Sequence, residues 1–152
     1  MSIESTMIRM EFKGNAEVNA APKEIFEILT IPDKLVKYIP GVKKYSYDEN
    51  GITMDVPVGF SFIRGTFKVK LKTLSSKAPS YVELKGSGSG SGSSVDFLTK
   101  FSIDPSSKGS KVSWDASVNV GGIAATFGGP MIKRAADKFI SQIIEDLKKK
   151  LQ

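Results

Sequence analysis

The side chains that carry most protein chemistry are missing from this chain, which contains neither histidine nor cysteine. The lack of cysteine excludes disulfides and thiolate metal ligands. The lack of histidine removes the commonest metal ligand and the only side chain whose ordinary pKa lies near neutrality. Nucleophile–base pairs of the serine–histidine kind are excluded for the same reason. We therefore expect no metal, no cofactor and no catalytic residues, and we favour a binding protein over an enzyme.

Catalysis would have to use a carboxylate, a lysine or a tyrosine with a shifted pKa. Asp55 and Asp115 each occupy a polar position in an alternating stretch, where a strand would turn them toward solvent. Neither has a neighbour along the sequence that suggests a tuned acid–base pair. The carboxylates therefore give no support to a catalytic site.

Positive charge is the second chemical feature, with a formal net charge of +6 and a pI of about 9.4. This balance favours acidic partners, although a solvated lysine-rich surface has the same composition. Lys148, Lys149 and Lys150 form a candidate membrane or partner surface. The structural alternative is that they complement a helix dipole, with Glu145 and Asp146 standing four residues before Lys149 and Lys150.

A second row of cations, Lys68, Lys70 and Lys72, shares one face of a predicted strand. These lysines could contact phosphates, or they could discourage edge pairing between molecules. That face carries no aromatic platform on which bases would stack, so nucleic acid is not the expected partner.

A long helix is expected at the end of the chain, from Pro130 onward. Proline suits the first helical turn, and about 22 residues at 1.5 Å each give a rod of roughly 33 Å. Apolar residues recur there at three- and four-residue spacing, so one wide stripe must be buried. The glycine-rich stretch 121–129 before the helix is expected to act as a hinge. The stripe comprises Ile132, Ala135, Ala136, Phe139, Ile140, Ile143, Ile144, Leu147 and Leu151.

Alternating apolar and polar residues predict that most of the remaining chain is strand. Asp33 is placed to cap a short helix, and Asn50-Gly51 is a strong hairpin signal. The expected elements are a strand over 8–20, helices over 21–30 and 33–38, and strands over 42–48, 52–58, 67–72, 81–85, 95–103 and 111–120.

Two stretches between these elements are unusual. Residues 59–65 form an apolar connection whose Phe60 and Phe62 could cover a cavity, touch a membrane or plug the core. The run Gly86–Ser94 has the composition of a flexible linker. However, its flanks continue the strand pattern without pause, so we interpret it as strand and turn that allow a bend and leave room for a helix or a ligand.

The order of elements predicts an α+β helix-grip fold. In it, a curved antiparallel sheet of about seven strands wraps around the long C-terminal helix, and two short helices after the first strand close one end. The length favours a single domain over residues 1–152. The N-terminus does not look like a signal peptide, so we expect a cytoplasmic protein, peripheral to the membrane if a membrane is its partner.

Several motifs in this order resemble the START-like (SRPBCC) helix-grip superfamily and, more narrowly, the CoxG-like family of carbon monoxide dehydrogenase subunits. They extend over nearly the whole chain: Phe12-Lys13-Gly14, Ala21-Pro22-Lys23-Glu24-Ile25-Phe26, Ile39-Pro40-Gly41-Val42, Phe62-Ile63-Arg64-Gly65-Thr66-Phe67, Gly86–Ser94 and the glycine pairs at 121–122 and 128–129.

A curved sheet that faces one helix rarely closes tightly, so an apolar pocket between them is the expected binding site. The resemblance implies that this pocket holds a small hydrophobic molecule, lipid- or quinone-like. It also implies association with a redox enzyme complex or the membrane surface. The alternatives are a START-like enzyme of the cyclase or hydrolase type and a protein-interaction or co-chaperone module. The expected lining is Val56, Phe60, Phe62, Leu71, Gly88, Gly90, Phe97, Trp114, Phe127, Met131 and Phe139.

Overall fold

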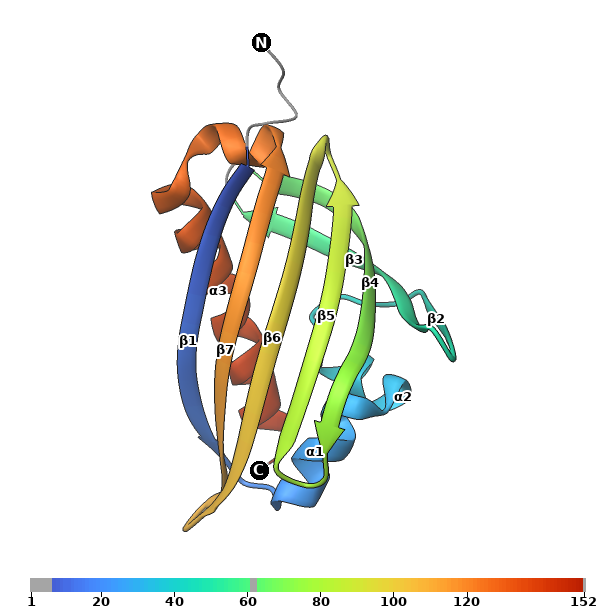
Figure 1. Cartoon of the computed structure of the whole chain (residues 1–152), viewed down its shortest axis with the longest axis vertical. Coiled ribbons are helices and arrows are strands. Elements are labelled where there is room, and N and C mark those ends of the chain that lie inside the picture. The colour runs from blue at the N-terminus through green and yellow to red at the C-terminus, as the bar shows by residue number, and fades with distance from the viewer. Residues whose placement is uncertain (1–6, 61–62, 152) are drawn as a thin grey trace.

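The computed structural model describes residues 7–60 and 63–151. An antiparallel sheet of seven strands, in the order β1-β7-β6-β5-β4-β3-β2, curves around a long C-terminal helix (Figure 1). Two short helical segments follow the first strand. The structure confirms the predicted α+β helix-grip architecture.

The strands are β1 (Met7–Val18), β2 (Tyr45–Asp48), β3 (Gly51–Phe60), β4 (Ile63–Lys77), β5 (Tyr81–Gly90), β6 (Ser93–Ser106) and β7 (Gly109–Gly122). The helices are α1 (Pro22–Thr30), α2 (Pro32–Leu35) and α3 (Gly129–Lys150), with short 3-10 segments η2 (Val36–Tyr38) and η3 (Ile123–Phe127).

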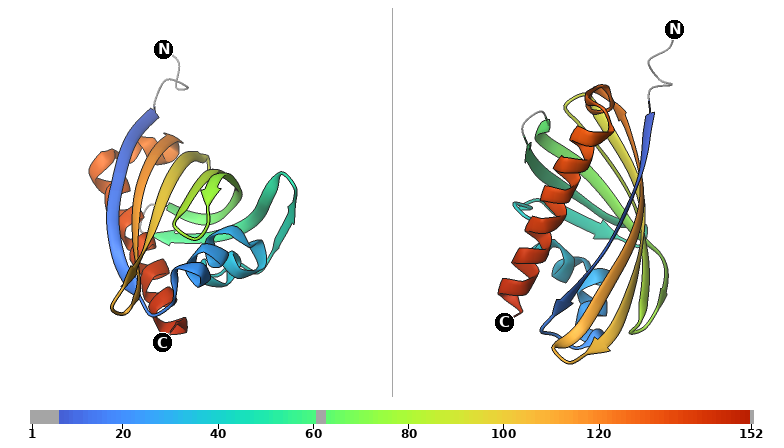
Figure 2. Two further views of the ribbon diagram at one scale, coloured as in Figure 1. Left: turned by 60° about the horizontal axis from the view of Figure 1, so that its bottom comes forward. Right: turned by 90° about the vertical axis from the view of Figure 1, so that its left-hand side faces the viewer.

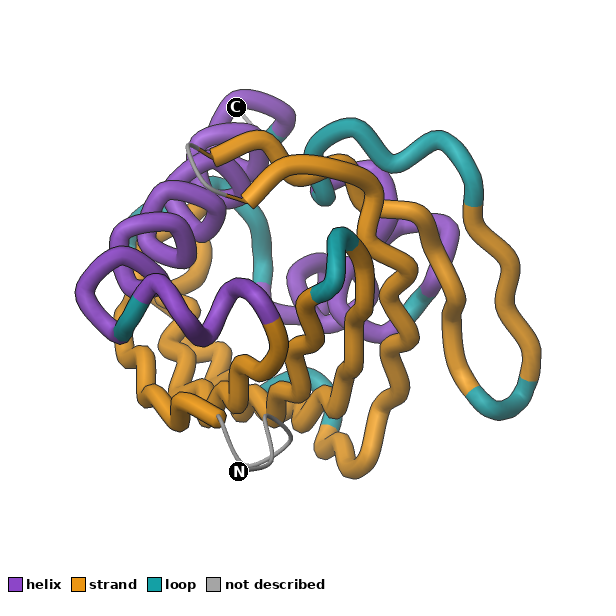
Figure 3. The backbone as a smooth tube through the Cα atoms, turned by 90° about the horizontal axis from the view of Figure 1, so that it is seen from above, coloured by secondary structure: helices purple, strands orange, loops and turns teal. Residues whose placement is uncertain are grey.

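Alternation along the strands determines which face of the sheet is dry. In β1 and β7, the paired residues Phe12 and Ala116 are both buried on the concave face, while their neighbours Glu11 and Lys13 are exposed. The sheet is open, with β1 at one edge and β2 at the other. Seen from above, the sheet curls until the end of β3 and the start of β4 lie close to α3 (Figure 3).

The glycine–serine run is strand and turn, as predicted. β5 continues through Gly90, and Ser91 and Gly92 make the turn with φ values of 51° and 72°. A Cβ atom on Gly86 would lie 2.2 Å from Cζ of Phe97. The glycine therefore admits the Phe97 ring of the neighbouring strand, which occupies the space that was predicted to receive a helix or a ligand.

The connection predicted over 59–65 is shorter in the structure. β3 extends to Phe60 and β4 begins at Ile63, so strand pairing replaces most of the expected loop. Phe62 lies outside the described residues, as does the side chain of Phe60.

Asp33 does not cap a helix, contrary to the prediction. Pro32 begins α2, so Asp33 lies inside its first turn and Ile31 takes the N-cap position without a side-chain bond. The Asp33 carboxylate instead accepts hydrogen bonds from the hydroxyls of Tyr45 (2.7 Å) and Tyr47 (3.0 Å) on β2. These bonds attach the β2–β3 hairpin to α2.

Helix α3 crosses the concave side of the sheet from the β1–β7 side toward α1 (Figure 2). The expected apolar stripe is present, but only Ile132 and Ala135 are buried. Phe139 packs against the core cluster around Val56 and Leu71, and Leu147 packs against the cluster around Ile25. The rest of the stripe is half-buried, because the sheet does not close onto the middle of the helix.

Candidate functional site

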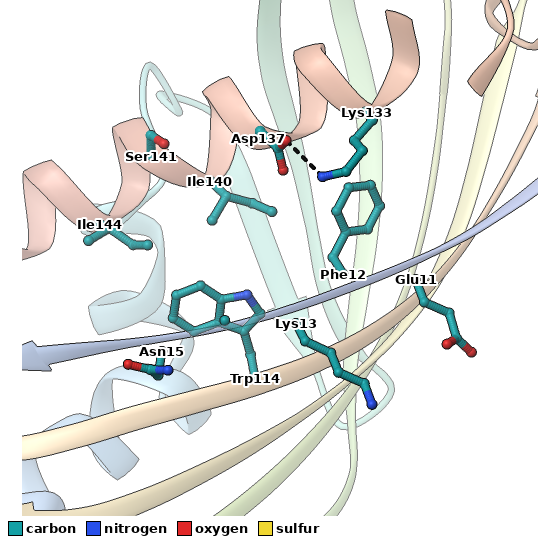
Figure 4. A pocket seen from close by; sticks show the side chains of 11 residues that line it. Glu11, Phe12, Lys13, Asn15, Trp114, Lys133, Asp137, Ile140, Ser141 and Ile144 are labelled. Atoms are coloured by element: carbon teal, nitrogen blue, oxygen red, sulfur yellow. Dashed lines mark hydrogen bonds and ion pairs between the residues drawn. The ribbon is translucent and has the colours of Figure 1, made fainter. Parts of the chain in front are cut away.

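A cleft of about 310 Å³ lies between α3 and the edge strand β1 (Figure 4). Phe12 and Trp114 contribute aromatic surface from the sheet. Ile140 and Ile144 point from α3 toward the indole of Trp114. Together they make the apolar part of a cleft that opens to solvent along the side of the molecule, and the charged residues Glu11 and Lys13 also line it.

The position of Trp114 depends on a glycine in the opposite strand. Gly14 is the cross-strand partner of Trp114 in the β1–β7 pair. A Cβ atom on Gly14 would lie 2.5 Å from Cζ2 of the indole. The ring therefore lies over the bare backbone of β1 and reaches into the cleft, where it is half-buried.

Polar groups surround the mouth of this cleft. The Lys133 ammonium forms an ion pair with Asp137 at 3.0 Å and lies 5.7 Å from the centre of the Phe12 ring. Asn15 and Ser141 add an amide and a hydroxyl to the rim. Both partners of the ion pair are exposed, so the pair itself contributes only about 0–1 kcal/mol to stability. A cleft whose lining combines apolar and polar side chains suits an amphipathic ligand.

The groups with shifted pKa values lie away from this cleft. The hydrogen bond from Lys34 lowers the pKa of Glu27. The hydrogen bonds that Tyr45 and Tyr47 donate to Asp33 raise the pKa values of both tyrosines. Burial, with a further contribution from Glu83, raises the pKa of Tyr81. Over residues 7–60 and 63–151, no three acidic side chains come together to hold a metal ion.

The predicted cavity residues do not gather at one place. Trp114 lines the cleft, whereas Val56 and Leu71 are buried in a core cluster against which Phe97 and Phe139 pack. Of the remaining described positions, Gly88 is tightly surrounded and Gly90 lies close to Thr66 and Phe67. Met131 is half-buried, and Phe127 is 40% exposed.

A second cleft of about 300 Å³ lies between the α1–α2 segment and the β2–β3 hairpin. Leu71, Ile52 and Leu84 form its floor, and all three belong to the core cluster on the concave face. Tyr47, held by Asp33, stands at its rim. The core is thus approached from two sides of the molecule.

Lys150, in the predicted lysine surface, has a local structural role. Its ammonium donates a hydrogen bond to the Lys37 carbonyl and lies 5.4 Å from the centre of the Tyr38 ring. Neither of the expected pairs, Glu145 with Lys149 or Asp146 with Lys150, is an ion pair in the described part of the chain. The contacts of Lys150 with Lys37 and Tyr38 thus connect the end of α3 to η2.

Sequence reasoning does not assign Gly14, Lys133 or Asp137 to a site. Ile140 and Ile144 belong to the predicted apolar stripe, and Phe12-Lys13-Gly14 is one of the motifs that carry the family resemblance. The missing information is the register between β1 and β7, since only this register places Gly14 opposite Trp114.

Known structures share this architecture. A conserved protein from Geobacillus kaustophilus superposes with a TM-score of 0.85 at 22% identity, covering 93% of this chain and 95% of that chain. Ginseng major latex-like protein 151 from Panax ginseng superposes with a TM-score of 0.68 at 10% identity, covering 95% and 98% of the two chains. At these identities the likeness concerns the fold alone. Among curated proteins, the sequence has no match.

The fold is that of a helix-grip protein, and together with the family match it supports the hydrophobic-ligand-binding type. Residues 14–152 match the CoxG family, described as the G subunit of carbon monoxide dehydrogenase, and the chain belongs to that family. The family consists of non-catalytic accessory proteins and points to a dehydrogenase complex or a membrane as partner. No helix in the described ranges is long and apolar enough to span a membrane.

Proposed function

We propose that this protein binds a small hydrophobic molecule, lipid- or quinone-like, between α3 and the sheet and releases it chemically unchanged. One observation carries the proposal. The apolar residues Ile140 and Ile144 of α3 stay half-buried beside a cleft of about 310 Å³ instead of packing into the core. Small-molecule sites occupy about 300–1,000 Å³, so the cleft has room for a ring-sized group.

The lining of the cleft indicates how such a ligand would lie. A flat ring would pack against the Trp114 indole and the two isoleucines, where burial of apolar surface provides the driving force of about 25 cal/mol per Å². Carbonyl or hydroxyl oxygens would face Lys133 and Asn15 at the mouth, where nitrogen donors are available. This arrangement binds and orients a ligand without supplying a group to react with it.

We also propose that the ligand is exchanged with a redox enzyme complex or with the membrane. Membership of the CoxG family supports this role, because an accessory protein acts on behalf of a larger partner. Co-purification of molybdenum-containing dehydrogenase subunits with the tagged chain from its own cells would support the enzyme as partner.

The intrinsic fluorescence of Trp114, the chain's only tryptophan, tests the binding site directly. Titration with a short-chain quinone or a medium-chain fatty acid should quench or shift this emission until one site is filled, and calorimetry should give the same affinity. Ile144→Ser should weaken binding about tenfold, because a buried aliphatic side chain contributes more than about 1.4 kcal/mol.

Ile31→Ser is the matched control, since Ile31 is 39% exposed and lies outside the cleft. It should leave the affinity unchanged. Equal losses for both variants, or a titration that never saturates, would refute the proposed site. Solvent extraction of freshly purified protein then distinguishes a quinone from a fatty acid or phospholipid.

A further inference from the structure

Several elements meet at the end of the molecule opposite the C-terminus (Figure 1). The start of β1, the start of β4, the β5–β6 turn, η3 and the first turns of α3 meet there. We call this surface the η3 end and define it as residues 7–10, 64–66, 89–95 and 119–134. Hydrogen bonds join its parts: among them, the Ser91 hydroxyl donates to the Arg64 carbonyl (2.6 Å), and the Ile123 amide donates to the Gly92 carbonyl (3.0 Å).

Large apolar side chains are exposed at the η3 end. Met7 is 50% exposed, Ile123 56% and Phe127 40%. Isolated exposed apolar residues are ordinary, but several on one end indicate an interaction site.

The exposure of Ile123 and Phe127 follows from how η3 is anchored. Ala124 and Ala125 are buried at 3% and 4% exposure, and the Ala124 amide donates to the buried Ser93 hydroxyl at 2.9 Å. The segment thus turns its small residues inward and its large ones outward, the reverse of the pattern that folding alone favours. Ile123 also lies against Gly92, so packing within the protein accounts for part of its side chain, and the exposed part is available to a partner.

The arginines of the chain are confined to the same end. Among the 22 basic residues only Arg9, Arg64 and Arg134 are arginine, and all three are exposed. Arg9 is two residues from Met7, Arg64 is the second residue of β4 and lies beside the β5–β6 turn, and Arg134 lies in the second turn of α3. Arginine binds phosphate through a planar fork that lysine lacks, so this distribution favours a phosphate-bearing partner.

Acidic residues are absent from the four stretches that define the η3 end. Within residues 7–60 and 63–151, the nearest along the chain are Glu11 and Asp96 on the outer face of the sheet, and Asp137, which is paired with Lys133. The four stretches themselves carry positive charge and no carboxylate, and the carboxylates of Glu11 and Asp96 border Arg9 on the outer face of the sheet. This combination is complementary to the headgroup region of an anionic bilayer, where phosphates lie next to hydrocarbon.

We propose that the η3 end docks on an anionic lipid bilayer, with Ile123 and Phe127 entering the interface and the three arginines binding lipid phosphates. The inference rests on the proposed function and deepens it by naming the partner and the surface. Helix α3 leads from this end to the cleft, whose rim residue Lys133 precedes Arg134. A docked molecule would hold the cleft close to the pool from which a hydrophobic ligand is drawn.

Co-sedimentation of the full chain with vesicles tests this docking. Vesicles of phosphatidylcholine with phosphatidylglycerol should bind the protein, and vesicles of phosphatidylcholine alone should bind it much more weakly. The variant Arg9→Gln/Arg64→Gln/Arg134→Gln should lower the partition coefficient at least about tenfold, because each lost cation weakens attraction to the anionic surface. Ile123→Ser/Phe127→Ser should lower it by a similar factor.

Two matched controls separate this surface from general attraction. Lys148→Gln/Lys149→Gln/Lys150→Gln removes the same three charges at the opposite end of the molecule, and Ile31→Ser/Leu74→Ser removes two exposed apolar residues elsewhere. Both should retain near-wild-type binding. Equal loss in the lysine variant would overturn the proposal in favour of nonspecific electrostatics, and absence of vesicle binding by the wild type would overturn it outright.

The quinone titration keeps this test separate from that of the cleft. Variants of the η3 end should bind a water-soluble quinone with unchanged affinity, and their thermal melting should show that they remain folded. Failure of vesicle binding with intact quinone binding refutes the docking surface only. Loss of quinone binding in the wild type refutes the proposed function and leaves vesicle binding to be judged by its own result.

Discussion

At the scale of single residues, the cleft depends on the pairing of Trp114 with Gly14. Tryptophan brings the largest apolar surface of any side chain, and a full side chain opposite it would push the ring out of the space it fills. Gly14 provides that space, because an added Cβ would lie 2.5 Å from the indole. The aromatic wall of the cleft therefore needs two residues on two strands.

We predict that Gly14→Ala destabilises the protein by about 1–3 kcal/mol, the usual cost of overpacking. The emission maximum of Trp114 should shift in the same variant, because the ring must move relative to solvent. Urea unfolding and fluorescence spectra provide the two measurements.

Gly59→Ala is the control, since Gly59 lies in strand β3 and an added Cβ there would meet nothing within 4 Å. It should leave the spectrum unchanged and the stability equal or slightly higher, because alanine restricts the unfolded chain. If both variants behave alike, the contact between Gly14 and Trp114 has no energetic importance.

At the scale of elements, the entrance to α3 decides how the helix is held. Gly122 and Gly128 flank η3 with φ values of +74° and +85°, in the left-handed region. The carbonyl oxygen of Gly92 would lie 2.3 Å from a Cβ on Gly122, whereas Gly128 has open space around it. A substitution at Gly128 therefore tests the backbone conformation alone, without a steric clash.

We predict that Gly128→Ala lowers the free energy of unfolding by about 1–2 kcal/mol, because alanine resists a left-handed backbone. The adjacent Gly129→Ala should be neutral or stabilising by up to about 1 kcal/mol, since Gly129 begins a helix and also has open space. Thermal and urea unfolding compare the two.

The same pair of variants tests the hinge predicted for residues 121–129. If α3 shifts when a ligand enters, Gly128→Ala should slow quinone uptake in stopped-flow fluorescence and Gly129→Ala should not. Unchanged uptake in the Gly128 variant would show that α3 stays in place.

At the scale of the whole molecule, the chain has no histidine to make its stability vary near neutrality. Glu27 has its pKa lowered from an ordinary 4.5, so its contribution is present above that value and is lost as the pH falls below it. Tyr45 and Tyr47 have pKa values raised above 10.0, so their contribution is present below that value and is lost at higher pH.

We therefore predict a flat plateau of stability across neutral pH, with losses on the acid side and above about pH 10. Urea unfolding followed by Trp114 fluorescence measures this profile. Asp33→Asn should reduce the loss of stability at alkaline pH, because ionisation of Tyr45 and Tyr47 would no longer break hydrogen bonds to a carboxylate. A transition in the neutral range would contradict the prediction and reveal a further titrating group.

The sequence by itself determined the elements and their order. Strict alternation in strands such as 111–120, the Asn50-Gly51 turn and the apolar periodicity after Pro130 are local patterns, and local backbone geometry follows from them. Even the glycine–serine run could be assigned to a strand from its flanks. The family resemblance rests on the same local motifs, so it too was accessible without coordinates.

The tertiary structure alone decided which residues share a site. Strand register places Gly14 opposite Trp114, and the curvature of the sheet sends Val56, Leu71 and Phe97 into the core while leaving Ile140 and Ile144 half-buried. Register and curvature bring together residues about a hundred positions apart. Both depend on many contacts between strands and not on any local sequence pattern. For that physical reason the fold and a pocket between sheet and helix could be predicted, whereas the residues that line the cleft could not.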